Sequence, residues 1–227
     1  MIHPLRGTSV LLAGATGGLG AALASELAKR GAVLTLVGRN AEVLSAIAVD
    51  GARHAADLRL PEACSGAVAA AVAHGGKLDV VINAVGVVAF GLIEELSIDA
   101  MEELFMTNTF IPIMLAKASL PQMTEGGIIV NISGVIAEQN LPGMAAYGAS
   151  KAAVASFSQA LAREARRKKI RVLDARPPHT NTSLSQHPIE GTAPRMPEGL
   201  SAEFVAQVIC DAIENNVADL PSSAFVA

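Results

Sequence analysis

The sequence predicts an α/β fold in which a single doubly wound parallel sheet is covered by helices on both faces. Short apolar segments of strand length alternate with helical segments along nearly the whole of the 227 residues. These short segments are continuously apolar, which is typical of strands buried on both faces. Hydrophobic residues make up 51% of the chain, enough for the core of a single domain over residues 1–227.

Six segments carry the strand pattern, and helical patterns lie between them. The expected strands are Ser9–Ala13, Val33–Val37, His54–Ala56, Val80–Asn83, Ile128–Ile132 and Arg171–Ala175. The first helix is expected over Ala21–Arg30, because two cations stand in its last turn and Gly31 follows. The longest apolar stretch, Val80–Ile93, contains one asparagine and two glycines, so we expect a buried strand that runs into a loop.

One region, Pro177–Leu200, lacks periodicity and is rich in Pro, Gly, Ser and Thr. It follows the C-terminal end of an expected strand, where ligands bind in sheets of this kind. Two interpretations are open, a mobile lid over a binding site or an ordinary surface loop. The position after the strand favours a substrate lid, which we place at residues 183–200. Its few charges and several apolar residues indicate a neutral, moderately apolar ligand.

The composition argues against several classes of protein. A net charge of −4 supplies no basic field for nucleic acid and no polybasic patch for a membrane surface. Cys64 and Cys210 have no metal or redox spacing, so they are expected to be structural, and no metal is expected. The first residues do not resemble a signal peptide and no apolar run reaches 18 residues, so a soluble, cytoplasmic protein is expected.

A glycine-rich turn connects the first expected strand to the first expected helix. Residues 13–20 read Ala-Gly-Ala-Thr-Gly-Gly-Leu-Gly. Glycines let the backbone turn sharply and approach a pyrophosphate, which the amides of the helix N-terminus then stabilise. A plain tight turn is the alternative, but the flanking strand and helix favour a Rossmann-type dinucleotide site. The candidate cofactor-binding residues in this turn are Gly14, Thr16, Gly18, Leu19 and Gly20.

The end of the second strand distinguishes the two nicotinamide dinucleotides. An Asp or Glu there would bind the ribose hydroxyls and repel the 2′-phosphate of NADP. The sequence instead has Val-Gly-Arg-Asn, and Arg39 can form charge-assisted bonds with a phosphate. NADP(H) is therefore preferred, while NAD(H) stays open if Arg39 is only a solvated residue. Further contacts, to the adenine and beneath the nucleotide, are expected from Asp57, Leu58, Asn83 and Gly86.

Tyr147, the one tyrosine of the chain, precedes Lys151 by four residues in an Ala-rich helical stretch. This spacing places the phenol and the ammonium on one helix face. At about 4 Å and an effective dielectric near 20, a unit positive charge is worth roughly 4 kcal/mol. Such an interaction could lower the pKa of the phenol from about 10 toward 7, which suits general acid–base catalysis at neutral pH. A Tyr-x-x-x-Lys pair by itself is common and usually structural.

Together these features resemble the classical short-chain dehydrogenase/reductase family along essentially the whole chain. That family combines a Thr-Gly-x-x-x-Gly-x-Gly loop with a Tyr-x-x-x-Lys helix. Residues 13–20 match the loop with Ala in place of the leading Thr, and Tyr147 and Lys151 match the helix. The family's Asn-Asn-Ala-Gly segment corresponds to Asn-Ala-Val-Gly at 83–86. Its Pro-Gly segment after the sixth strand corresponds to Pro-Pro at 177–178, followed by His-Thr-Asn-Thr.

The resemblance implies a role for each matched residue. Tyr147 would exchange a proton with the substrate oxygen. Lys151 would hold the nicotinamide ribose and lower the tyrosine pKa. Thr180 and Thr182 would lie near the carboxamide of the nicotinamide.

The family's catalytic Asn corresponds to Asn108, and the sequence offers a physical reason for its position. Pro112 lies four residues later and cannot donate a helical hydrogen bond to the Asn108 carbonyl. In a helix, that carbonyl would be free to hold a water, as the corresponding carbonyl does in the proton relay of the family. A simple proline kink in a core helix is the alternative.

One departure from the family concerns the serine whose hydroxyl steadies the substrate oxygen. The family places it thirteen residues before the tyrosine, where this chain has Gly134. Ser133 is one step away, and a one-residue step along a strand reverses the direction of a side chain. Irregular backbone at the strand end could restore that direction, so Ser133 is a candidate substitute. Loss of one such donor typically costs about 10²–10³ in rate and need not abolish catalysis.

The sequence therefore predicts an oxidoreductase that transfers a hydride between NADP(H), or NAD(H), and a small carbonyl or alcohol substrate. Its candidate catalytic residues are Tyr147, as general acid/base, with Lys151, Asn108 and Ser133. A nucleotide-binding regulatory or scaffolding protein with weak or no turnover is one alternative, because Gly134 occupies the serine position. A different reaction on the same scaffold, such as dehydration or epimerisation, is another. The resemblance also implies a homo-oligomer, a dimer or a tetramer.

Overall fold

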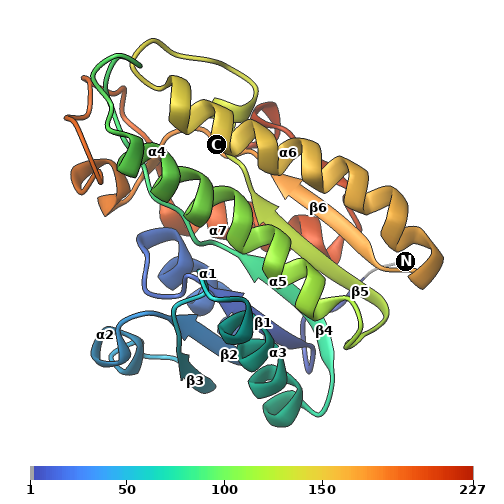
Figure 1. Ribbon diagram of the computed structural model, residues 1–227. Coiled ribbons are helices and arrows are strands. Elements are labelled where there is room, and N and C mark those ends of the chain that lie inside the picture. Colours follow the sequence, from blue (N-terminus) through green and yellow to red (C-terminus); the bar gives the residue numbers. More distant parts are fainter. Residues whose placement is uncertain (1–2, 227) are drawn as a thin grey trace.

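A seven-stranded parallel sheet forms the centre of the structure (Figure 1). The computed structural model describes residues 3–226, in which the strand order is β3-β2-β1-β4-β5-β6-β9. The strands are β1 (Ser9–Ala13), β2 (Val33–Gly38), β3 (Ala52–Ala55), β4 (Leu78–Asn83), β5 (Met123–Ile132), β6 (Arg171–Ala175) and β9 (Asp219–Leu220). Strands are added outward on one side of β1 and then on the other, so the sheet is doubly wound. The predicted fold class is confirmed.

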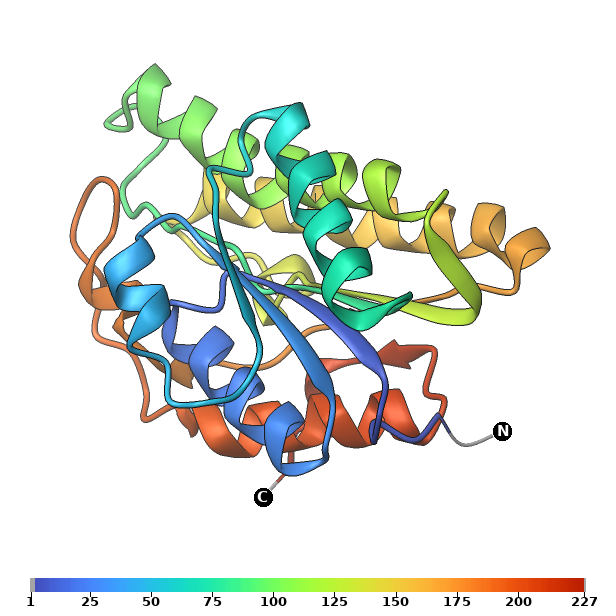
Figure 2. The same cartoon turned by 90° about the horizontal axis from the view of Figure 1, so that it is seen from below.

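Helices cover both faces of the sheet (Figure 2). In that view α1 and α7 lie below the sheet, whereas α3, α5 and α6 lie above it. The helices are α1 (Gly18–Lys29), α2 (Ala41–Ser45), α3 (Pro61–Gly75), α4 (Ile98–Phe105), α5 (Ile111–Ser119), α6 (Ala145–Ala165) and α7 (Ala202–Glu214). Among the described residues, no helix combines the length and apolar character needed to cross a membrane.

Successive residues of the central strands enter different cores, which explains their continuous apolar pattern. Val10 and Leu12 of β1 are fully buried in the core shared with α1 and α7. Leu11 and Ala13 are fully buried in the core shared with α3, α5 and α6. Burial of a Val or Leu side chain contributes about 1.5–3 kcal/mol, so both faces of such a strand favour the sheet.

Several element boundaries differ from those predicted. β5 begins at Met123 instead of Ile128. Its first four residues are partly or fully exposed near a register irregularity opposite β4, so they lack the buried apolar pattern that predicts a strand. α1 begins at Gly18 instead of Ala21, since the glycine-rich turn itself forms the first turn of the helix. The two-residue β9 was not predicted. Residues 177–200, which were expected to lack periodicity, are mostly irregular and contain only short elements. These are β7 (Thr180–Asn181), a 3₁₀ turn (Ser183–Gln186) and the start of β8 (Leu200–Ser201).

α4 continues into α5 through one π-helical turn, Met106–Phe110. The Ile111 N–H donates to the carbonyl of Met106, five residues earlier. Such wider turns are rare and often lie at functional sites. Pro112 stands at the start of α5, so the helical run is irregular where the sequence analysis expected a proline effect. That the Asn108 carbonyl is free of a helical hydrogen bond and can hold a water stays a prediction.

Candidate active site

The glycine-rich turn passes so close to its neighbours that side chains would not fit. A Cβ at Gly14, where φ is +82°, would lie 2.7 Å from the carbonyl carbon of Ala84 after β4. A Cβ at Gly20 would lie 2.0 Å from the Gly14 carbonyl oxygen. A Cβ at Gly18 would lie 2.9 Å from the Cβ of Thr182. The bare start of α1 therefore faces Thr182, an arrangement that fits a dinucleotide whose pyrophosphate lies at the helix N-terminus.

A pocket at the carboxyl ends of β1, β2 and β4 contains six of the predicted cofactor contacts. Its lining includes the predicted residues Gly14, Thr16, Arg39, Asp57, Leu58 and Gly86. Thr16 lies against β2, because a Cβ at Gly38 would be 2.8 Å from its methyl group. Asn83 lies at the end of β4 with its buried Oδ1 atom lacking a hydrogen-bond partner within residues 3–226. Leu19 instead packs against the core beneath α1.

Arg39 is exposed at the rim of this pocket and makes no hydrogen bond or ion pair within residues 3–226. It follows β2 and precedes Asn40, whose side chain accepts from two amides of α2 and caps that helix. The guanidinium is thus free to meet a phosphate. Its positive charge also helps to lower the pKa of Asp57 in the same pocket, although Arg59 contributes most to that effect.

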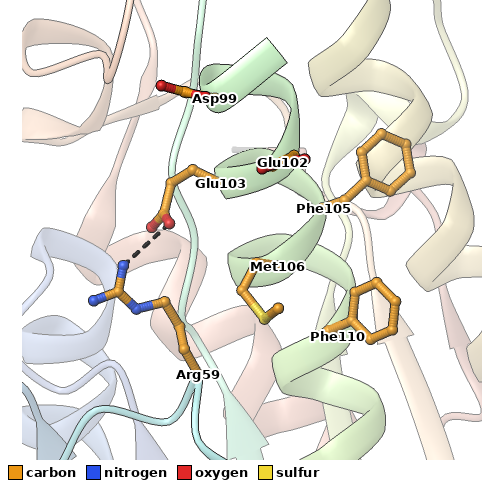
Figure 3. Close-up of a pocket in the computed structure, with 7 residues that line it drawn as sticks. All are labelled: Arg59, Asp99, Glu102, Glu103, Phe105, Met106 and Phe110. Atoms are coloured by element: carbon orange, nitrogen blue, oxygen red, sulfur yellow. Dashed lines mark hydrogen bonds and ion pairs between the residues drawn. The ribbon is translucent and has the colours of Figure 1, made fainter.

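Arg59 is a pocket residue that the sequence analysis missed. It donates to both carboxylate oxygens of Asp57, and its Nη2 atom lies 2.6 Å from Oδ2. It also pairs with Glu103 of α4 at 3.1 Å, as Figure 3 shows beside Met106. Arg59 therefore connects the nucleotide pocket to α4. Its position two residues after Asp57 is only a weak sequence signal for the Arg59–Asp57 ion pair. The pairing with Glu103 has no sequence signal.

Lys151 and Asn108 both lie next to Gly86, which lines the pocket. A Cβ at Gly86 would lie 3.5 Å from the Nζ atom of Lys151 and 3.4 Å from the Oδ1 atom of Asn108. Lys151 is 7% exposed, and its Nζ donates to the carbonyl of Ile132 at 2.8 Å. The structure thus brings together three of the predicted site residues, from the loop after β4, the π-helical turn and α6.

The side chain of Asn108 joins the π-helical turn to its surroundings. Its Oδ1 accepts from the Val87 N–H at 2.9 Å, and its Nδ2 donates to the Val87 carbonyl at 3.0 Å. The same Nδ2 donates to the Ser150 hydroxyl at 3.0 Å, and Thr109 donates to the Ser150 carbonyl. Asn108 is thereby fixed beside the residue that precedes Lys151.

The ionisation of Tyr147 differs from the expectation. Burial raises the pKa of its phenol to about 12, whereas the helical spacing predicted a lowered pKa. Burial also lowers the pKa of Lys151 to about 8, against which the charge of Asp174 acts in the opposite direction. The prediction of a lowered Tyr147 pKa is wrong for this structure, because loss of hydration outweighs a lysine whose ammonium is directed to Ile132.

Ser133 does not take the place of the missing serine. Its side chain is fully buried, and its hydroxyl donates to the Oδ2 atom of Asp174 at 2.9 Å. The backbone is irregular here, as the sequence analysis considered, because the N–H groups of Ser133 and Gly134 both donate to the Ala175 carbonyl. Gly134 has φ +79° and ψ 164°, a conformation that is essentially restricted to glycine. The irregularity therefore leaves Ser133 bound to β6 instead of restoring it to the site.

The segment after β6 contacts the glycine-rich turn and the loop after β4, and hydrogen bonds hold it in place. Thr182 lies against the glycine-rich turn, while the Thr180 hydroxyl donates to the Pro178 carbonyl at 3.0 Å. Further along, the Phe90 N–H donates to the Glu190 carbonyl, and the Glu190 carboxylate accepts from Ser97 at the start of α4. Residues 183–200 are thus fastened to the loop that follows β4.

Comparisons with known proteins agree with this geometry. The model of the short chain dehydrogenase family matches residues 8–192. An uncharacterized oxidoreductase of Methylorubrum extorquens is 35% identical over 74% of this chain and 71% of its own length. The mouse protein dehydrogenase/reductase SDR family member 7B is 32% identical over 98% of this chain and 75% of its own.

Solved structures show the same architecture. A short chain dehydrogenase of Burkholderia cenocepacia in complex with NADP is 26% identical, with a TM-score of 0.85 over 99% of this chain and 100% of that chain. A dehydrogenase/reductase of Sinorhizobium meliloti is 25% identical, with a TM-score of 0.83 over 96% and 95%. The chain belongs to the short-chain dehydrogenase/reductase family and is an NAD(P)-dependent oxidoreductase.

Proposed function

We propose that this protein reduces a carbonyl compound to an alcohol with NADPH, using Tyr147 as the proton donor and Lys151 as the ribose-binding cation. The observation that carries the proposal is that Lys151 and Asn108 both lie next to Gly86, which lines the nucleotide pocket. A bound nicotinamide dinucleotide would supply or accept the hydride. The protein would then need only to orient the substrate and move one proton.

Three residues divide that work. The phenol of the partly buried Tyr147, with a pKa of about 12, is protonated at neutral pH and can donate to the oxygen of a carbonyl. Lys151 uses one N–H on Ile132, so its other donors are available to ribose hydroxyls. Asn108, whose side chain is fully engaged, would act through its backbone carbonyl.

The choice of NADP(H) over NAD(H) is supported by Arg39. Its guanidinium stands at the rim of the nucleotide pocket without a partner within residues 3–226. Asp57, a carboxylate that lines the same pocket, is paired with Arg59 at 2.6 Å. Its negative charge should therefore repel a phosphate only weakly. The Burkholderia relative contains NADP. Residues 183–200 would serve as the substrate lid of this single domain.

A second candidate function is nucleotide binding with weak or no turnover. It is favoured by one observation, that neither Gly134 nor Ser133 offers a hydroxyl to the substrate oxygen. The two functions make opposite predictions for Tyr147→Phe. In the reductase, this variant should bind NADPH normally and lose at least about 10²-fold in rate.

The experiment is a titration of NADPH binding beside a screen of NADPH oxidation on ketones, aldehydes and quinones. Tyr147→Phe, which keeps the ring and removes only the hydroxyl, is the matched variant. Tight NADPH binding without turnover of any compound would favour the second function. Turnover that Tyr147→Phe leaves unchanged would refute the role of the phenol, and substrate conversion without net NADPH oxidation would indicate dehydration or epimerisation.

A further inference from the structure

A cluster of charged residues with a buried centre lies at the end of β6, which packs against α6, the helix that carries Tyr147 and Lys151. The proposed reaction does not use these charged residues. Asp174 on β6 is 4% exposed, and its Oδ2 accepts from the Ser133 hydroxyl at 2.9 Å and from Arg176 at 2.8 Å. Arg176 in turn pairs with Glu138 and with Asp219, the latter at 2.8 Å. A charge buried in this way normally costs stability, so its place beside the site calls for an explanation.

The cluster is connected to Lys151 through the end of β5. Ser133 directly follows Ile132, whose carbonyl holds the Lys151 ammonium at 2.8 Å. The Ser133 side chain is tied to Asp174, and the Ser133 N–H donates to the neighbouring Ala175 carbonyl at 3.0 Å. The acceptor of the ammonium is therefore fixed by contacts between the end of β5 and β6.

The same carboxylate also acts through its charge. Its second oxygen, Oδ1, is buried without a hydrogen-bond partner within residues 3–226. Arg176 is shared among three carboxylates and offsets only part of the charge of Asp174. Of the charged groups around Lys151, Asp174 is the one that raises its pKa, against the lowering caused by burial.

We propose that Asp174 is a positioning residue for Lys151: it fixes the end of β5 that holds the ammonium and supplies the negative charge that opposes loss of its proton. The inference rests on the proposed function, in which a charged Lys151 binds the nicotinamide ribose. A neutral amine at that position would hold the ribose less well. NADPH affinity should therefore fall at alkaline pH, with a midpoint that depends on Asp174.

The experiment measures the dissociation constant of NADPH from pH 6 to pH 10 by fluorescence, for the full chain and for Asp174→Asn. The substitution keeps the shape and removes the charge. We expect the alkaline midpoint to move down by roughly half to one pH unit, with several-fold weaker binding at pH 8 and little change at pH 6. Tyr147, on the same helix, has a pKa of about 12 and titrates outside this range.

Two further variants separate charge from structure. Asp219→Asn removes another carboxylate from Arg176, so it perturbs the same cluster and should leave the midpoint unchanged. Ser133→Ala leaves Asp174 charged but removes the hydrogen bond that ties the end of β5 to it. The Ile132 carbonyl should then hold the ammonium less firmly, so the midpoint should move in the same direction by less. If Asp174→Asn fails to fold by circular dichroism, Ser133→Ala decides. An unmoved midpoint in the decisive variant, or an equal shift in Asp219→Asn, would overturn the inference.

Failure of the underlying function has its own signature. Lys151→Met should bind NADPH more weakly than the unmodified chain and without the alkaline fall. If Lys151→Met binds NADPH as tightly as the unmodified chain, Lys151 does not hold the cofactor and the proposed function is wrong at that point. If Lys151→Met abolishes the alkaline fall while Asp174→Asn leaves it in place, only the role of Asp174 is wrong.

Discussion

Restoring the serine of the family at Gly134 should not restore its function. Gly134 has φ +79° and ψ 164°, where an L-residue is strained. Space is not the obstacle, because a Cβ there would have the Pro177 carbonyl oxygen as its nearest neighbour, at 3.9 Å. Gly134→Ser should therefore fold, with a strained backbone and a side chain that lies toward Pro177.

The cost follows from the backbone conformation. A non-glycine residue in such a region costs about 1–3 kcal/mol. In a chain of this size each kcal/mol lowers the melting temperature by about 2–4 °C, so we expect a fall of roughly 2–12 °C. A well-placed donor would raise the rate by about 10²–10³. We expect a change in kcat below about tenfold, because this backbone does not give a serine the geometry of an ordinary strand end.

The assay combines calorimetric melting with NADPH oxidation on the best substrate from the screen. Gly134→Ala is the matched control, since it adds the same Cβ and the same strain without a hydroxyl. The two variants should lose equal stability. A Gly134→Ser protein that is as stable as the parent and gains a hundredfold in kcat would refute this reasoning. Gly134 would then differ from the family's serine only in lacking the catalytic hydroxyl.

Two other substitutions test charges at the site. Arg39→Ala should raise the Michaelis constant for NADPH at least about tenfold while changing that for NADH little, because a charge-assisted bond to the 2′-phosphate is worth about 1.5–3 kcal/mol; equal effects on both would refute phosphate binding. Lys151→Met should stabilise the protein by about 1–3 kcal/mol at pH 7, because it removes a buried cation whose pKa falls from 10.5 to about 8. Because the pKa is lower in the folded protein, the charged lysine reduces the free energy of unfolding. Urea unfolding should therefore show the stability gain of the variant below pH 8 and its disappearance near pH 10.5. A variant that is less stable than the parent at pH 7 would contradict this prediction.

The sequence predicted the fold well where burial alone decides the structure. β1 and β6 have the predicted bounds, because all or most of their residues are buried between two helical layers and such strands read as short apolar runs. β9 could not be predicted, since two residues, Asp219 and Leu220, carry no pattern and are held by pairing with β6. Irregular turns such as Met106–Phe110 likewise depend on tertiary contacts.

The candidate site was predictable where a residue type is required by the backbone or by a matched motif. Gly14 and Gly20 follow from close approaches that only glycine permits. Arg59 was missed because its partner Glu103 is distant in the sequence. The pKa of Tyr147 was misjudged because helical spacing gives the distance to a charge and not the loss of hydration. The homo-oligomer and the cytoplasmic location stay predictions.

The departures from the family near the catalytic helix are physically coupled. Gly134 lacks the hydroxyl, and its positive φ accompanies the two amides that share the Ala175 carbonyl. With the end of β5 in this conformation, the Ser133 hydroxyl donates to Asp174 and does not face the substrate site. Asp174 in turn requires Arg176, since a buried carboxylate without a cation would be costly. One substitution at Gly134 changes only the first of these features. In the proposed reaction the substrate oxygen would therefore be oriented by Tyr147 and by the fit of the substrate beneath the proposed lid, residues 183–200. Selectivity should then depend on that segment more than on a hydroxyl.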